Sequence, residues 1–283
     1  MPKNISRRGF VQTAAVLAAS ATLASAPASA VSLRGRIKKA VGYGMIKEKL
    51  SVVDKFKMLK DLGIEGVEIS IRDAGQRADL LKAIDTTGIP VHGVVNGSTD
   101  KLNNAIDLAK ALGATSVLVV AGRVNETSPY AKNYETTQAT IREAIPYAEK
   151  NEVPLLVENV WNNFLLSPLE MARYVDELDS PWAGAYFDVG NVARFGWPTH
   201  WIPVLGKRIR RVHIKAYSRK KQMDEGPWKG FQVKIGDDEI DWPAVRKELV
   251  AIDYRGWVTA EVGGGNRARL ADISARMDKV LDL

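Results

Sequence analysis

The stretch Ala183-Gly184-Ala185-Tyr186-Phe187-Asp188-Val189 is a nearly continuous run of apolar residues. A strand that is buried on both faces has this pattern, whereas a half-exposed strand alternates apolar and polar residues. Seven further runs of this kind lie along the chain, at Val41–Met45, Gly66–Ser70, Val91–Val95, Ser116–Ala121, Pro154–Val160, Val212–Ala216 and Trp257–Val262. The sequence therefore predicts eight buried strands.

Amphipathic stretches separate these strands. They are Val52–Leu62, Arg77–Thr87, Leu102–Leu112, Thr136–Asn151, Pro168–Leu178, Pro243–Ile252 and Ala268–Leu281. Eight strands alternating with helices are typical of a (β/α)8 TIM barrel in a single domain. An open doubly wound sheet would place a glycine-rich turn after its first strand, but Met45-Ile46-Lys47-Glu48 follows there. The longest irregular stretch, Tyr217–Ile240, falls where loops of a barrel usually serve the active site.

The composition is that of an ordinary globular protein and excludes several classes of site. Of the 283 residues, 46% are hydrophobic and 26% charged, which excludes a disordered or collagen-like chain. There is no cysteine, so a disulfide scaffold, a cysteine-ligated zinc site and a thiol nucleophile are all excluded. The formal net charge is +7, and the +4 that remains without the first thirty residues is too small and too evenly spread to indicate a nucleic-acid partner.

The first thirty residues are typical of an export signal rather than of the folded domain. Lys3 and the pair Arg7-Arg8 precede an apolar stretch rich in alanine that ends at Ala28-Ser29-Ala30. The paired arginines followed by Phe10 resemble the twin-arginine (Tat) export motif, and the apolar stretch is too weak for a permanent membrane span. We therefore expect a signal over residues 1–30, a barrel over residues 31–283, and a periplasmic or secreted product. Loss of the three basic residues would lower the net charge to +4.

The carboxyl ends of the last four strands each carry one side chain able to bind a metal ion. These are Glu158, Asp188, His213 and Glu261, in strand order. In a barrel these ends meet at one face, so the four side chains should converge. Each acid alone could instead pair with a lysine or arginine, but three converging carboxylates need a cation to neutralise them. Three carboxylates and one imidazole suit Mn²⁺, Mg²⁺ or Co²⁺, with Zn²⁺ also compatible.

At these residues the sequence resembles the xylose-isomerase-like TIM barrels, and among them the sugar and sugar-phosphate isomerases and epimerases. The matching stretches are Val157-Glu158-Asn159-Val160-Trp161, Tyr186-Phe187-Asp188-Val189-Gly190-Asn191, Val212-His213-Ile214-Lys215 and Thr259-Ala260-Glu261-Val262. The resemblance covers essentially all of residues 31–283. It implies that Glu158, Asp188, His213 and Glu261 bind one divalent metal ion, often manganese. It also implies that Glu158 and Glu261 are catalytic and move a proton beside a substrate carbonyl.

Six further residues are candidates for binding the substrate. Arg219 stands six residues beyond His213, as in ketose 3-epimerases of that family, whereas Asn191 resembles the sugar-phosphate epimerase branch. Lys215 could donate to a substrate oxygen or pair with a carboxylate of the metal site. The other three residues could each have a structural role instead. Glu68 could bind sugar hydroxyls or pair with Arg72, and His92 could face the barrel mouth or lie in the core. Trp161 could stack on a sugar ring or pack against other side chains.

Together these residues predict a metal-dependent isomerase or epimerase that acts on a sugar, keto-sugar or sugar phosphate through an enediolate. Two alternatives remain open: a metal-dependent lyase or dehydratase on an oxidised sugar or cyclitol, and a secreted sugar-binding protein without turnover. A DNA endonuclease of the same fold is rejected, because it uses many histidines and this chain has three. The resemblance also implies that copies of the chain could associate, although no residue indicates an interface.

Overall fold

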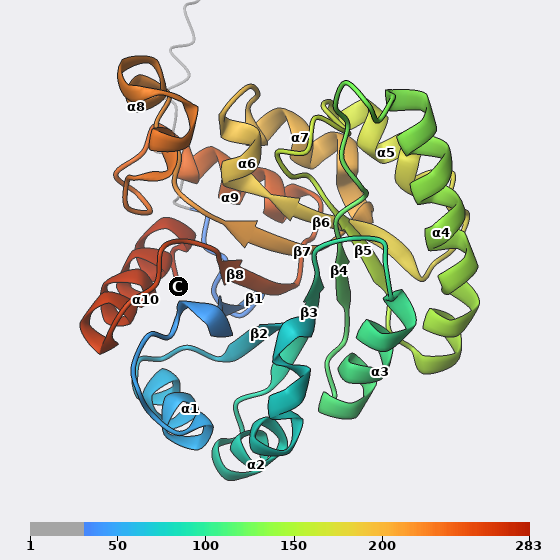
Figure 1. Ribbon diagram of the computed structural model, residues 1–283. Coiled ribbons are helices and arrows are strands. Elements are labelled where there is room, and N and C mark those ends of the chain that lie inside the picture. The colour runs from blue at the N-terminus through green and yellow to red at the C-terminus, as the bar shows by residue number, and fades with distance from the viewer. Residues whose placement is uncertain (1–30) are drawn as a thin grey trace, which may run out of the picture. The chain divides into compact units, whose positions relative to one another are not determined.

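Eight parallel strands close into a barrel in the computed structural model, which describes residues 31–283 (Figure 1). The strands are β1 (Ile37–Gly42), β2 (Gly66–Ser70), β3 (Val91–Asn96), β4 (Val117–Val119), β5 (Leu155–Glu158), β6 (Ala183–Asp188), β7 (Ile209–Ile214) and β8 (Gly256–Ala260). Ala40 of β1 aligns with Gly66 of β2 on one side and with Thr259 of β8 on the other, which closes the ring. The predicted (β/α)8 barrel is confirmed.

Helices surround the barrel and connect its strands (Figure 1). They are α1 (Val52–Asp61), α2 (Arg77–Thr87), α3 (Leu102–Leu112), α4 (Tyr130–Asn151), α5 (Pro168–Asp176), α6 (Val189–Ala193), α7 (Pro198–Leu205), α8 (Arg219–Glu225), α9 (Trp242–Ala251) and α10 (Arg267–Leu281). Short 3₁₀ helices are η1 (Tyr43–Met45), η2 (Ile71–Gln76), η3 (Gly206–Arg208) and η4 (Pro227–Phe231). The stretch between β7 and α9, expected to be irregular, contains α8 and η4.

Local sequence signals set the helix boundaries. The Ser51 side chain accepts a hydrogen bond from the backbone of Asp54 at the start of α1, and Ser167 caps α5 in the same way. Gly88 ends α2 with a φ of 73°, a left-handed conformation that glycine adopts without a steric cost. These caps explain why α1 and α5 begin, and α2 ends, where the sequence predicts.

Two strands begin earlier in the chain than the sequence predicts. β1 starts at Ile37 rather than Val41, and β7 starts at Ile209 rather than Val212. Both strands open with paired basic residues, Lys38-Lys39 and Arg210-Arg211, which a search for apolar runs excludes. Lys39 nevertheless fits because its Nζ atom lies 2.5 Å from Oδ1 of Asp278 on α10. The expected strand end Tyr43–Met45 is the 3₁₀ helix η1 instead.

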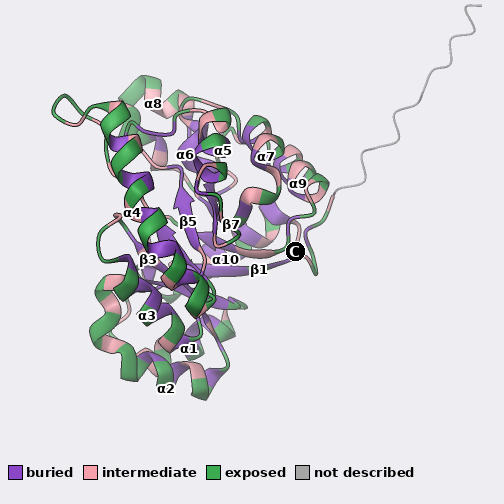
Figure 2. Cartoon of the chain, turned by 90° about the vertical axis from the view of Figure 1, so that its right-hand side faces the viewer, coloured by how far each residue is buried: buried purple, intermediate pink, exposed green. Residues whose placement is uncertain are grey.

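The strands are buried on both sides, as Figure 2 shows in purple. Every residue of β6 is buried, which explains its continuous apolar pattern. Alternate residues of a strand face the barrel interior, where Leu118, Leu156 and Tyr186 form a small cluster apart from the main core. Glu158 and Asp188 lie two residues beyond Leu156 and Tyr186, so they face the same interior at its carboxyl-terminal end.

The predicted signal, residues 1–30, lies outside the described residues. Among residues 31–283, no helix combines the length and the apolar character needed to cross a membrane.

Candidate active site

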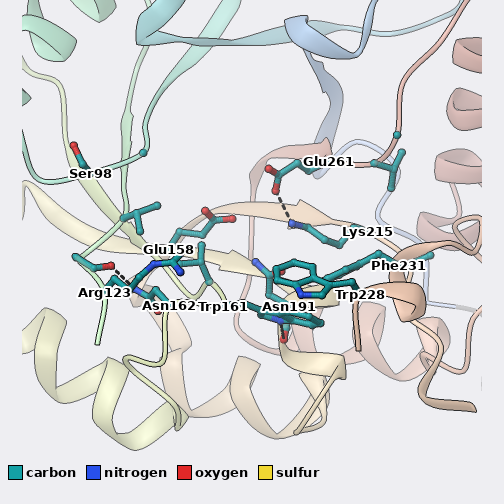
Figure 3. Close-up of a pocket in the computed structure, with 17 residues that line it drawn as sticks. Ser98, Arg123, Glu158, Trp161, Asn162, Asn191, Lys215, Trp228, Phe231 and Glu261 are labelled. Atoms are coloured by element: carbon teal, nitrogen blue, oxygen red, sulfur yellow. Dashed lines mark hydrogen bonds and ion pairs between the residues drawn. The ribbon is translucent and has the colours of Figure 1, made fainter. Parts of the chain in front are cut away.

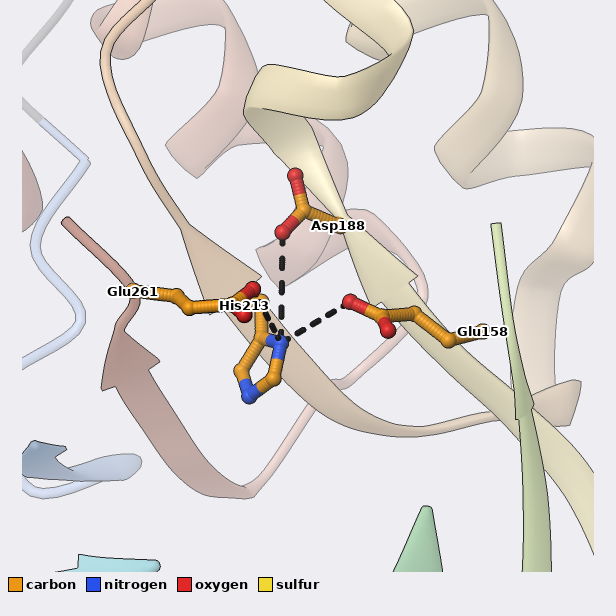
Figure 4. Close-up of side chains that lie close together, drawn as sticks. All are labelled: Glu158, Asp188, His213 and Glu261. Carbon is orange, nitrogen blue, oxygen red and sulfur yellow. Dashed lines mark hydrogen bonds and ion pairs between the residues drawn. The ribbon is translucent and has the colours of Figure 1, made fainter. Parts of the chain in front are cut away.

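Four side chains from four consecutive strands meet at one end of the barrel. Glu158 ends β5, Asp188 ends β6, His213 is the penultimate residue of β7, and Glu261 directly follows β8. One ligand atom from each residue lies within 4.8 Å of the others. Figure 4 shows the three carboxylates approaching Nδ1 of His213, and the nearest oxygens of Glu158, Glu261 and Asp188 lie 3.0, 3.2 and 3.9 Å away.

This arrangement concentrates negative charge away from water. Asp188 is fully buried, Glu158 and His213 are nearly so, and the Glu261 side chain is 51% exposed at the mouth. Burial, reinforced by the charge of Glu261, raises the pKa of Glu158 to about 7, and burial also raises the pKa of Asp188. Desolvation of charged carboxylates therefore has to be offset by a cation.

Lys215 supplies one positive charge from the chain itself. Its Nζ atom lies 2.7 Å from Oε2 of Glu261 and 3.2 Å from Oδ2 of Asp188. Burial opposes the charge of Lys215, but Asp188 and Glu261 raise its pKa. Burial likewise opposes the charge of Glu261, but Lys215 and His213 outweigh it and hold that pKa below the usual range.

The donor set fits a divalent metal ion. Oδ2 of Asp188 is buried and accepts no hydrogen bond, although the Lys215 ammonium lies 3.2 Å away, so this oxygen could still bind a metal ion. Carboxylate oxygens are hard ligands and the imidazole nitrogen is of intermediate softness, and such a set suits Mn²⁺, Mg²⁺, Co²⁺ and Zn²⁺. Glu158, Asp188, His213 and Glu261 could therefore hold a metal ion.

Glu68 supports His213 from inside the barrel. Its Oε2 atom lies 2.7 Å from Nε2 of His213, and its Oε1 atom accepts a 2.8 Å hydrogen bond from the Tyr186 hydroxyl. Burial opposes the charge of Glu68, but His213 lowers its pKa below the usual value. A carboxylate on Nε2 keeps the proton there and leaves the Nδ1 lone pair free for the cluster. The structure thus gives Glu68 partners other than the expected sugar hydroxyls or Arg72.

A network of amides holds the ends of β5 and β6 together. The backbone N–H of Asp188 donates to the Asn159 side chain at 2.8 Å, and the Asn191 side chain donates to the Asn159 carbonyl at 2.9 Å. The backbone N–H of Asn191 in turn donates to Oδ1 of Asp188 at 2.6 Å. These bonds fix one Asp188 oxygen and leave the other facing the cluster.

A cavity of about 740 Å³ opens above the four residues (Figure 3). The floor of the cavity is lined by Glu158, Glu261 and Lys215. One wall is aromatic and consists of Trp161, Trp228 and Phe231. Ser98, Arg123, Asn162 and Asn191 are among the polar residues that line the rest. Of the residues expected to bind substrate, Lys215, Asn191 and Trp161 therefore face this cavity.

The other three expected substrate residues, Glu68, His92 and Arg219, do not line the cavity. His92 is buried inside the barrel, where its Nε2 atom lies 3.0 Å from the Thr259 hydroxyl and its ring stacks on Trp257. Burial lowers the pKa of His92 to about 3, so it is neutral at pH 7. The Arg219 guanidinium donates to the carbonyls of Ala193 and Gly196, which fastens the start of α8 to the end of α6.

Several residues of the cavity wall were not predicted from the sequence. Arg123 and Asn162 follow the ends of β4 and β5, so inspection of every strand end would have drawn attention to both. Trp228 and Phe231 lie in the long stretch between β7 and α9 that was assigned to the active-site face, but no periodicity marked these two rings.

Comparison with known proteins identifies the family. The family model described as xylose isomerase-like TIM barrel matches residues 56–280. The chain belongs to the xylose isomerase-like TIM barrel family. Curated relatives include a protein of Escherichia coli K12 provisionally named an L-ribulose-5-phosphate 3-epimerase, 25% identical over 75% of this chain and 83% of the relative. Another is the 2-oxo-tetronate isomerase of Pectobacterium atrosepticum, 24% identical over 79% of this chain and 91% of its own.

Solved structures of two sugar epimerases share the barrel of this xylose isomerase-like chain. The 3-keto-D-glucoside 4-epimerase of E. coli superposes with a TM-score of 0.73 at 14% identity, covering 88% of this chain and all of the other. A D-allulose 3-epimerase from a Methylomonas species gives a TM-score of 0.70 at 16% identity, covering 87% of this chain and 98% of the other. At such identities the likeness shows the shared fold. The two curated relatives described above are an epimerase and an isomerase by name, which supports an enzyme of that kind.

Proposed function

We propose that this protein is a divalent-metal-dependent isomerase or epimerase that moves a proton beside the carbonyl of a sugar or keto-sugar. The observation that carries the proposal is the convergence of Glu158, Asp188, His213 and Glu261 at the floor of the main cavity. The relatives named as sugar epimerases and isomerases support the same reaction class.

Within this proposal the two glutamates transfer the proton. Glu158 and Glu261 come from strands that are not neighbours, and Figure 4 shows their carboxylates on opposite sides of His213. A sugar carbon between them would expose one face to each carboxylate. Removal of a proton by one and return to the opposite face by the other inverts the carbon. Return by the first carboxylate to the neighbouring carbonyl carbon, with the hydroxyl proton passing to the former carbonyl oxygen, moves the carbonyl instead. A bound divalent ion would polarise the carbonyl and stabilise the negative charge that forms on the substrate oxygens.

The neighbouring residues would position the sugar. The Lys215 ammonium reaches the cavity beside Glu261 and has N–H bonds to share with a substrate oxygen. Asn191 lines the same wall. The aromatic wall on this side would exclude water from the reacting carbon, which strengthens the electrostatic interactions there.

The proposal includes export. Residues 1–30 carry the paired arginines and the alanine-rich stretch of a signal, which supports a periplasmic or secreted enzyme. Sugar phosphates are largely cytoplasmic, so an exported enzyme would meet free sugars, keto-sugars or glycosides. Activity confined to phosphorylated ketoses would contradict this part of the proposal.

Metal content tests the proposal directly. The purified protein, loaded with Mn²⁺ and desalted, is expected to retain one divalent ion per chain by plasma mass spectrometry. The Asp188→Ala and His213→Ala variants should lose it, because each removes a buried ligand. The metal-loaded wild type should then exchange sugar C–H protons with D₂O in a screen of ketoses and keto-glycosides. A wild type that stays metal-free after loading would overturn the mechanism.

Glu68→Gln should weaken metal binding although Glu68 does not reach the ion. The variant removes the charge that faces Nε2 of His213, and loss of such a supporting carboxylate typically costs about 10–100-fold in metal affinity. Competition with a chelator measures this affinity without any need for activity. Glu143→Gln, an exposed change on α4, is the control. Equal affinities of Glu68→Gln and wild type would show that Glu68 does not support the site.

A further inference from the structure

An exposed tryptophan stands in the wall of the active-site cavity. Trp228 belongs to η4, within the segment between β7 and α9, and is 68% exposed although it lines the cavity. Its ring centroid lies 4.8 Å from that of Trp161, and Phe231 lies 4.6 Å from Trp161 on the same cluster. The outermost ring therefore has neighbours behind it and solvent in front.

The rings behind Trp228 are held in place. The Trp161 indole N–H donates to the Asn191 carbonyl at 3.0 Å, and the Arg194 guanidinium lies 4.2 Å from the centre of the Trp161 ring. Tyr217 contacts both Trp161 and Phe231, with ring centroids 5.5 and 4.8 Å away. Because these contacts hold the cluster, Trp228 presents a supported apolar face to the cavity.

The cavity is larger than the reaction needs. Its volume of about 740 Å³ lies in the upper half of the range for drug-sized ligands, and one monosaccharide on the four converging residues fills only part of it. In Figure 3 the Trp228 ring lies over Trp161 in the part of the cavity beyond Lys215 and Glu261. The space beside Trp228 is therefore continuous with the reaction site but separate from the proton-transferring groups.

The chemistry of this wall suits a neutral ring. A sugar ring has an apolar C–H face that packs on an aromatic ring, whereas a phosphate needs cations. Of the two cations nearest these rings, Arg194 stacks on Trp161, and Lys215 lies beside Asp188 and Glu261 at the reaction site. Arg123 also lines the cavity, and Figure 3 shows it on the side of Asn162 and Glu158.

We propose that Trp228 forms a second sugar-ring subsite, so that the substrate is a two-ring keto-glycoside rather than a single free sugar. The keto ring would lie on the four converging residues, and the ring that does not react would stack on Trp228. This inference rests on the proposed function for the position of the first ring. The segment between β7 and α9 would then select substrates by their length.

Calorimetry on the Mn²⁺-loaded protein tests the subsite with two probes, 3-keto-D-glucose and 3-keto-cellobiose. The wild type should bind the two-ring probe about tenfold more tightly, an effect in the range of one aromatic stacking contact. Trp228→Ala should bind the two probes with equal affinity, and Trp228→Phe should restore part of the preference. Met223→Ala, an exposed change on α8 outside the cavity wall, should behave as wild type.

The outcomes separate this inference from the proposed function. Equal affinity of the wild type for the two probes, including no binding of either, overturns the subsite, as does a preference that survives Trp228→Ala. A wild type that prefers the two-ring probe but exchanges no proton with D₂O supports the subsite and overturns the proposed reaction. A wild type that exchanges protons with both probes at equal kcat/KM keeps the reaction and overturns the subsite.

Discussion

Glu158→Gln should reduce the exchange of sugar C–H protons with D₂O by about 10²–10⁴-fold, the usual contribution of a positioned acid or base. The amide keeps the size of the side chain and one oxygen toward His213 but cannot accept the proton. Glu261→Gln should cause a loss of similar size in an epimerase, because each carboxylate serves one face of the carbon. In an isomerase that uses one carboxylate, only one of the two variants should show the full loss.

Proton exchange has to be measured at saturating Mn²⁺ with metal content determined on the same samples, since both glutamates are also candidate ligands. NMR of the substrate C–H signal in D₂O gives the rate. The control is again Glu143→Gln, which is exposed on α4 and does not line the cavity. Undiminished exchange in both metal-loaded variants would remove the glutamates from the reaction. Retained sugar affinity with no exchange in the wild type would favour a binding protein instead.

Gly190→Ala should destabilise the fold by about 3 kcal/mol, at the upper end of the usual cost of overpacking. A Cβ atom at Gly190 would lie 2.2 Å from Cγ of Lys215 and 2.5 Å from its backbone oxygen. A flexible side chain could move aside, but the backbone after β7 cannot do so without disturbing the strand. Chemical denaturation measures the loss of stability.

The same substitution should also damage the site. Displacement of Lys215 would break its ion pairs with Asp188 and Glu261, so metal affinity should change together with stability. Gly75→Ala is the matched control, because nothing lies within 4 Å of a Cβ atom built there. If Gly190→Ala unfolds at the same denaturant concentration as Gly75→Ala, then the close approach of α6 to Lys215 does not constrain the fold.

The sequence predicted the architecture where patterns are local. β2, α2 and α3 have the expected bounds, because capping and periodicity are read over a few residues. The predicted starts of β1 and β7 were wrong because each strand begins with a basic pair, Lys38-Lys39 or Arg210-Arg211. These side chains can lie in a strand because they contact residues that are distant in the sequence. Lys39 reaches Asp278, 239 residues away in the chain. α6 and α7 were not predicted, because both are short.

The candidate metal ligands could be predicted because strand ends of a barrel converge by construction. The position of Glu68 could not, since the pairing of β2 with β3 shifts register between Val67 and Glu68 and such an irregularity changes where a side chain points. Arg219 was expected at the substrate by analogy with ketose 3-epimerases. In this chain its guanidinium donates hydrogen bonds to the carbonyl of Ala193 in α6 and to that of Gly196 in the segment after it.

The order of the four converging residues along the chain has a consequence for how the protein is made. All four come from β5 to β8, and Glu261 directly follows the strand that pairs with β1. A growing chain that has not yet reached residue 261 holds three of the four groups, and the fourth takes its place only when the two ends of the sheet meet. Such a pairing between distant segments is among the slowest events in folding. Acquisition of a tightly held ion would therefore report that the chain has been made at least as far as residue 261 and that the ring has closed.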